Sequence, residues 1–202
     1  MSAIEPLHVA LPDRLRTDRM LLRCPTQDDA TALNEAVCES LAELRPWMPW
    51  AQTAPTLDAS QADCRRLQAQ FLTREHLPMF MFERRADGGE GRFIGGAGLH
   101  RILWDVRRFE IGYWCRTMLR GQGFVGEAVD ALNRFSFDQL RARRVEVRMD
   151  PSNERSWRVA ERAGFTLEGT LRMDSLNPLG EPRDTRVYAR VRGAEEPSGA
   201  PP

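Results

Sequence analysis

Residues 120–127 form the segment whose composition most directly indicates chemistry. They read RGQGFVGE and stand before a run of apolar residues at helical spacing. Glycines let a ligand approach the backbone closely, and the free amides at a helix start attract phosphate oxygens. The residues alone leave two interpretations open, a phosphate-binding loop or a plain turn. Both the dinucleotide-binding fingerprint and the P-loop are disfavoured, because the acidic partner of the first and the Lys-Ser/Thr ending of the second are missing.

Periodic apolar residues predict the elements that position this segment. Thr26 and Asp29 resemble a helix N-terminal cap, and Asn153 and Gly164 are typical of the start and end of a later helix. We expect, in chain order, a strand at 20–23, helices at 30–44 and 58–75, strands at 77–84, 92–103 and 109–115, a helix across 125–135, a strand at 144–149, a helix up to residue 163, and strands at 165–169 and 185–192. The early strands form an antiparallel meander and the 125–135 helix implies a parallel crossover, so the predicted fold class is mixed α/β.

Length and composition favour one domain and limit the classes of function. We expect a domain at residues 14–192, a flexible start at 1–13, and a disordered tail at 193–202, which reads GAEEPSGAPP. Lys plus Arg equals Asp plus Glu at 29 each, so a nucleic-acid partner is not expected. No stretch has the pattern of a signal peptide or a membrane span, which predicts no membrane association and a cytoplasmic location.

The cysteines and histidines do not form a recognisable ligand set. Cys24, Cys38, Cys64 and Cys115 are separated by 14, 26 and 51 residues. This spacing matches neither a zinc site nor a dense disulfide framework, so we expect free thiols and no metal. The three histidines are scattered along the chain, and none is assigned a role.

Three segments together resemble the GCN5-related N-acetyltransferase (GNAT) superfamily. They are LRTDRMLLR at 15–23, EIGYW at 110–114 and SNERSWRVAERAGFTLEGTLR at 152–172. The family's pyrophosphate loop reads Gln/Arg-x-x-Gly-x-Gly/Ala, which Arg120 and Gly123 match, whereas Val125 stands where the family prefers Gly or Ala. The chain looks most similar to the RimJ/RimL-like subgroup, which acetylates N-terminal amines of ribosomal proteins. The resemblance implies acetyl transfer from acetyl-CoA to a primary amine.

The resemblance also implies an architecture and a cofactor site. We expect a mixed, mostly antiparallel sheet of six or seven strands, splayed between its fourth and fifth strands and flanked by about four helices. The pantetheine arm of acetyl-CoA inserts at the splay in the family. The residues thereby placed at the CoA site are Trp114, Cys115, Arg116, Arg120, Gly121, Gln122, Gly123, Phe124, Val125, Gly126, Glu127, Asn153 and Ser156.

Two residues are candidates for proton transfer. Glu110 matches a glutamate that some relatives use as a base, and it could equally be a strand-edge carboxylate paired with Arg107 or Arg108. Ser156 occupies the place of a serine near the CoA sulfur in the ribosomal subgroup, where it could protonate the thiolate, or it merely occupies the first turn of a helix. Asn153 could contact pantetheine as well as cap that helix.

The acceptor side is less defined. Trp47 and Trp50 lie in a proline-rich segment that borders the acceptor site in the family, and they could wall that site or only pack a helix junction. Asp174 is a reserve base, near the place of a second acidic residue in the ribosomal subgroup. The acceptor is expected to be a protein N-terminus or a small amine, and a homodimer is possible.

Several mechanisms and functions remain open at this point. The leading hypothesis is direct attack of the amine on acetyl-CoA in a ternary complex. A route through an acylated Cys115 is disfavoured because no histidine neighbours it in sequence. The alternative functions are a non-catalytic acyl-CoA sensor and a phosphate-binding module for ordinary nucleotides.

Overall fold

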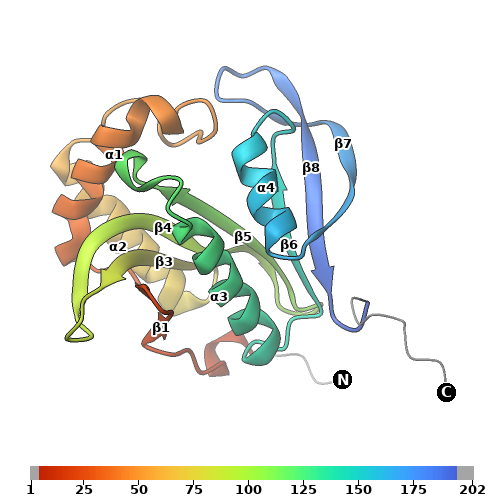
Figure 1. Ribbon diagram of the computed structural model, residues 1–202, viewed down its shortest axis with the longest axis horizontal. Helices are drawn as coiled ribbons and strands as arrows, with labels where there is room; N and C mark the ends of the chain where they lie inside the picture. Colours follow the sequence, from red (N-terminus) through yellow and green to blue (C-terminus); the bar gives the residue numbers. More distant parts are fainter. Residues whose placement is uncertain (1–4, 195–202) are drawn as a thin grey trace.

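The computed structural model describes residues 5–194, which form one sheet with α-helices on both faces (Figure 1). The expected flexible start and disordered tail fall partly on residues 1–4 and 195–202, which lie outside the described residues. Within the described part of the start, Pro6–His8 form a short 3-10 helix, and Val9 and Leu11 pack against the core.

The sheet of the described chain has eight strands, one or two more than predicted. In chain order the strands are β1 (Arg14–Arg16), β2 (Met20–Arg23), β3 (Leu77–Arg84), β4 (Glu90–Leu103), β5 (Arg108–Cys115), β6 (Arg144–Met149), β7 (Thr166–Leu176) and β8 (Pro182–Val191). Their spatial order is β1-β2-β3-β4-β5-β6-β8-β7, and every neighbouring pair is antiparallel except β5 with β6. The additional strand, β1, has only three residues, too few to show an alternating pattern.

Strands β5 and β6 part after three residues. Their parallel register runs from Arg108 opposite Arg144 to Glu110 opposite Glu146 and then stops, although β5 continues to Cys115. These strands correspond to the fourth and fifth of the prediction, so the expected splay is confirmed. Backbone groups of β5 beyond Glu110 therefore face a gap instead of a neighbouring strand.

Four α-helices cover the two faces of the sheet. They are α1 (Ala30–Leu44), α2 (Leu57–Thr73), α3 (Phe124–Asp138) and α4 (Glu154–Arg162). Phe80 and Phe82 of β3 pack in one cluster with α1, whereas Met79 and Met81 pack in the cluster that contains α3. Because side chains alternate along a strand, α1 and α3 lie on opposite faces. Among the helices of residues 5–194, none is long and apolar enough to cross a membrane.

Local sequence signals account for the helix boundaries. The Asp29 carboxylate accepts a hydrogen bond from the Thr26 amide at 2.7 Å. This is one of the two reciprocal hydrogen bonds of a capping box, and it forms the N-terminal cap expected before α1. Asn153 accepts one from the Ser156 amide at 3.2 Å and so begins α4. Gly164 ends that helix with a φ of 76°, a conformation that glycine adopts without strain. These predictions are confirmed.

Candidate active site

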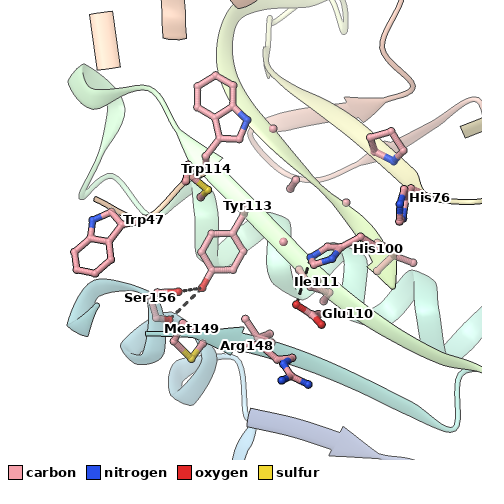
Figure 2. Close-up of a pocket in the computed structure, with 18 of the residues that line it drawn as sticks. Trp47, His76, His100, Glu110, Ile111, Tyr113, Trp114, Arg148, Met149 and Ser156 are labelled. Atoms are coloured by element: carbon pink, nitrogen blue, oxygen red, sulfur yellow. Dashed lines mark hydrogen bonds and ion pairs between the residues drawn. The ribbon is translucent and has the colours of Figure 1, made fainter. Parts of the chain in front are cut away.

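A cleft of about 480 Å³ opens where β5 and β6 part (Figure 2). Its lining comes from the α1–α2 connection, α2, β3, β4, β5, β6, the start of α4 and the start of β8. Alternation along β5 divides the lining between two faces. Glu110, Gly112 and Trp114 face the side of α1 and α2, whereas Ile111 and Tyr113 face the side of α3 and α4. One strand therefore presents two chemically different surfaces to one opening.

Glu110 is the buried carboxylate of this cleft. Its side chain is 6% exposed, and its Oε2 lies 3.4 Å from Nη1 of Arg101, not beside Arg107 or Arg108 as the pairing interpretation predicted. Burial raises the pKa of Glu110 to about 7, with a further raising effect from the nearby charge of Glu146 and opposing effects from surrounding arginines. A carboxylate with a pKa near neutrality can accept a proton at physiological pH, so the geometry favours a base.

A histidine that the sequence left without a role lies against this carboxylate. Nε2 of His100 on β4 is 3.6 Å from Oε1 of Glu110 (Figure 2). A Cβ atom on residue 112 would lie 2.6 Å from that nitrogen, so the ring fits only because residue 112 is glycine. Burial lowers the pKa of His100 to about 4, which makes the imidazole neutral at pH 7. The cross-strand pairing of His100 with Glu110 is a property of the sheet that spacing along the chain did not reveal.

On the opposite face, Tyr113 points at the start of α4 (Figure 2). Its hydroxyl lies 2.9 Å from Oγ of Ser156 and donates to the Ser156 carbonyl at 3.1 Å. Burial raises the pKa of Tyr113 to about 12, so it holds its proton. The structure thus joins the predicted Ser156 to a tyrosine that sequence reasoning missed. In the sequence, Tyr113 was marked only by its place in the EIGYW segment. Because side chains alternate along a strand, Tyr113 points to the face opposite that of Glu110.

The 120–127 segment is a loop, exposed at residues 121–123, that ends as the first turn of α3. Gly121 and Gly123 have φ values of 75° and 84°, which L-residues rarely adopt, and Gly123 is the N-cap of the helix. The guanidinium of Arg120 forms an ion pair with Glu43 of α1, and Nε of Arg116 lies 2.6 Å from Glu39. Free helix amides, glycines and an arginine at one loop fit a phosphate group.

Comparison with known families settles the class of protein. A family model described as an acetyltransferase (GNAT) domain matches residues 19–166. The chain belongs to the GNAT acetyltransferase family. Acetyl transfer is therefore its chemistry, and acetyl-CoA is its acetyl donor.

Individual relatives support the ribosomal-type subgroup. The ribosomal-protein-serine acetyltransferase of Escherichia coli (strain K12) is 27% identical over 179 residues, covering 87% of this chain and 94% of that protein. The uncharacterized N-acetyltransferase YoaA of Bacillus subtilis (strain 168) is 29% identical over 181 residues, covering 90% and 98%. A solved structure of the RimL ribosomal-protein acetyltransferase in complex with coenzyme A has the same fold, with a TM-score of 0.80 at 21% identity and coverage of 88% and 97%.

Two residues of the predicted CoA set have other contacts in this GNAT domain. The side chain of Val125, the departure from the family pattern, packs against the core, so its bulk points away from the loop's amides. The carboxylate of Glu127 accepts hydrogen bonds from the backbone N–H and Nε of Arg19 at 3.0 and 2.7 Å. The Glu127 side chain therefore holds α3 against the segment before β2. The Glu127 backbone belongs to the first turn of α3.

Cys115 is the last residue of β5. Its side chain is buried, and burial raises the pKa of the thiol to about 11. Because the thiolate is the nucleophilic form, this environment argues against an acylated cysteine and is consistent with direct transfer. Among residues 5–194, no group of three or more His, Cys, Asp or Glu side chains could hold a metal ion.

Aromatic side chains wall the α1–α2 side of the cleft. Trp47, Trp50 and Trp114 all line it, and the rings of Trp50 and Trp114 meet edge to face with centroids 5.8 Å apart. Trp50 is 53% exposed, so about half of its side chain is open to solvent. The ring of Trp114 lies over Gly96, where a Cβ atom would be 2.7 Å from Nε1. Trp114 thus presents its side chain to the α1–α2 side of the cleft, although its backbone belongs to the predicted CoA edge.

Asp174 does not line the cleft but borders it through Arg148. Its Oδ2 lies 2.7 Å from Nη2 of Arg148, and this hydrogen bond lowers the pKa of Asp174 below its usual value despite a smaller opposing effect of burial. A carboxylate that holds its charge against an arginine is a poor proton acceptor. The structure therefore favours Glu110 over Asp174 as the base.

Proposed function

We propose that this GNAT protein acetylates the N-terminal amine of a polypeptide by direct attack on acetyl-CoA in a ternary complex. The observation that carries the proposal is the position of Glu110, a buried carboxylate with a pKa of about 7 on the acceptor face of the β5–β6 opening. The name of the Escherichia coli relative, a ribosomal-protein-serine acetyltransferase, supports a protein acceptor.

Deprotonation of the amine and protonation of the thiolate occur on opposite faces of β5. An amine arriving as an ammonium ion must lose a proton before it can attack, and Glu110 accepts that proton on the α1–α2 face. The thiolate that leaves must gain a proton, and the Tyr113 hydroxyl, hydrogen-bonded to Ser156 at 2.9 Å, donates it on the α3–α4 face. The second proton that the nitrogen loses, from the adduct with the thioester, restores this hydroxyl. Attack and departure thus occur from opposite sides of one opening.

Binding of the donor uses backbone on both sides of β5. The amides that begin α3, with Arg120, bind the diphosphate, and the edge of β5 beyond Glu110 is free to pair with the pantetheine amides as an additional strand would. Asn153 lies at the same opening and offers its side-chain amide to the arm. The aromatic wall of Trp47, Trp50 and Trp114 contacts the residue that carries the amine.

A thiol-release assay tests the proposal. Acetyl-CoA is offered with peptides that begin with Ser or Ala, with the same peptides carrying a blocked N-terminus, and with small amines such as polyamines. Release of thiol with the free peptides alone supports the proposal, whereas turnover restricted to small amines overturns the protein acceptor. Binding of CoA without turnover on any acceptor favours the alternative of an acyl-CoA sensor.

A further inference from the structure

Four ionisable side chains lie in one row across the sheet at the base of the cleft. His100 pairs directly with Glu110, and Glu110 pairs directly with Glu146. Leu77 pairs with Leu99, so His76, which precedes it, stands next to His100. Cross-strand partners share one face of a sheet, and Figure 2 shows His76, His100 and Glu110 following one another along the cleft wall.

The overall reaction requires a proton to leave this cleft. An ammonium acceptor loses two protons in becoming an amide, one when it becomes an amine and one from the adduct with the thioester. Only one of them is taken up, by the sulfur of CoA. One proton per turnover must therefore pass from the base to solvent, yet Glu110 is only 6% exposed.

The two neighbours of Glu110 differ in their ability to take that proton. Glu146 is 3% exposed, and its Oε2 lies 2.8 Å from Nε of Arg144, so it is already paired with a cation and has little contact with water. The side chain of His100 is 37% exposed, and its Nε2 faces Glu110 at 3.6 Å. This distance is a few tenths of an ångström longer than that of a hydrogen bond, and a small rotation of either side chain would close the difference.

Charges around the pair favour loss of the proton from Glu110. By contrast, burial and the charges of Arg101 and His76 lower the pKa of His100, so its imidazolium is short-lived. Arg101 contacts Glu110 from β4, and the charges of Arg148 and Arg108 act on it from β6 and β5. These cations stabilise the carboxylate after the proton has left it. His76, which also lines the cleft, has an Nδ1 that is buried without a hydrogen-bond partner, so a second imidazole lies next to His100.

We infer that His100 relays the proton from Glu110 to solvent, at the end of the cleft bordered by His76. Glu110 first takes the proton from the ammonium and becomes a neutral carboxylic acid. The acid O–H then protonates the lone pair on Nε2 of His100, and the imidazolium releases its Nδ1 proton outward. This restores Glu110 and leaves His100 as its Nε2–H tautomer, which exchange of the ring protons with water returns to the starting tautomer. The inference rests on the proposed role of Glu110 as base.

Replacing His100 with Gln tests the relay with a Ser-initiated peptide as acceptor. Glutamine keeps a polar group near Glu110 but cannot carry a proton, so kcat/KM for the peptide should fall about tenfold while the KM for acetyl-CoA stays unchanged. Added imidazole should restore the rate of His100→Gln in proportion to its concentration. The control is His8→Gln, an exposed histidine remote in sequence, which should neither lose activity nor respond to imidazole.

A substrate-free measurement keeps the relay testable if the peptide proves to be the wrong acceptor. In protein labelled with ¹⁵N-histidine, the His100 ring signals should shift with a midpoint near pH 7 as Glu110 ionises, and Glu110→Gln should abolish that shift. The relay would be overturned if the His100 ring signals did not shift near pH 7. It would also be overturned if imidazole failed to restore the activity of His100→Gln. Full activity of Glu110→Gln would instead exclude Glu110 as the base. Failure of the relay and failure of the proposed base can therefore be told apart.

Discussion

Replacing Glu110 with Gln should change stability and activity in opposite directions. Burial raises the Glu110 pKa from 4.5 to about 7, so the folded protein binds this proton more tightly than the unfolded chain does. Above pH 7 the folded state must hold a buried charge. At 1.36 kcal/mol per pKa unit, that charge costs up to about 3 kcal/mol of unfolding free energy relative to acidic pH. Glutamine has nearly the same shape and carries no charge, so the variant avoids this cost.

The sign of the effect follows from the proton balance. Between pH 4.5 and 7 the folded state binds more protons at this site than the unfolded state, so the contribution of Glu110 to stability falls as pH rises through that window. His100 acts oppositely, because its lowered pKa of about 4 adds stability as pH rises towards 6.5. The histidine is present in both proteins, and comparing variant with wild type therefore isolates the carboxylate.

Urea denaturation of both proteins at pH 4 and pH 8 measures the difference. The stability of Glu110→Gln relative to wild type should increase by up to about 3 kcal/mol from the acidic to the basic condition. The same variant should lose about 100-fold or more in turnover, and wild-type kcat/KM should rise through pH 7 as Glu110 ionises. A stability difference that does not change with pH would refute the reasoning about burial, because the carboxylate would then ionise in the fold as it does in water.

Three further predictions concern the donor site. Gly123→Trp should abolish CoA binding in calorimetry while the fold persists, and Gly180→Trp, at a similar φ of 83° in the β7–β8 turn, should bind normally; equal loss in both would make the effect one of backbone strain. Tyr113→Phe should lower turnover about 100-fold with unchanged acetyl-CoA affinity, and an unaltered rate would exclude this hydroxyl as the acid. Glu43→Gln should release its partner Arg120 and tighten CoA binding about threefold at low salt, an effect that should shrink in 0.5 M salt; weaker binding would instead show that Glu43 orders the loop.

The predicted elements agree with the structure where local patterns are strong. The strands at 77–84 and 144–149 have the predicted ends, and α4 begins and ends at the predicted caps. Strand β7 runs to Leu176, well beyond the predicted end at residue 169. Its pairing with β8 holds it as a strand, although it exposes nearly all of its side chains. Such an edge strand has no buried face to mark it in the sequence.

The amino-acid sequence by itself indicated the family, because each of the three segments that carry the resemblance is short and continuous, and it singled out the 120–127 loop and Glu110 as candidates. The tertiary structure decided what that carboxylate contacts. His100, Glu110 and Glu146 lie on three strands that only the sheet brings into one row, and Tyr113 meets Ser156 only after the chain has crossed over through α3. The burial that moves the pKa of Glu110 likewise arises from distant segments packed around it, which no spacing along the chain encodes.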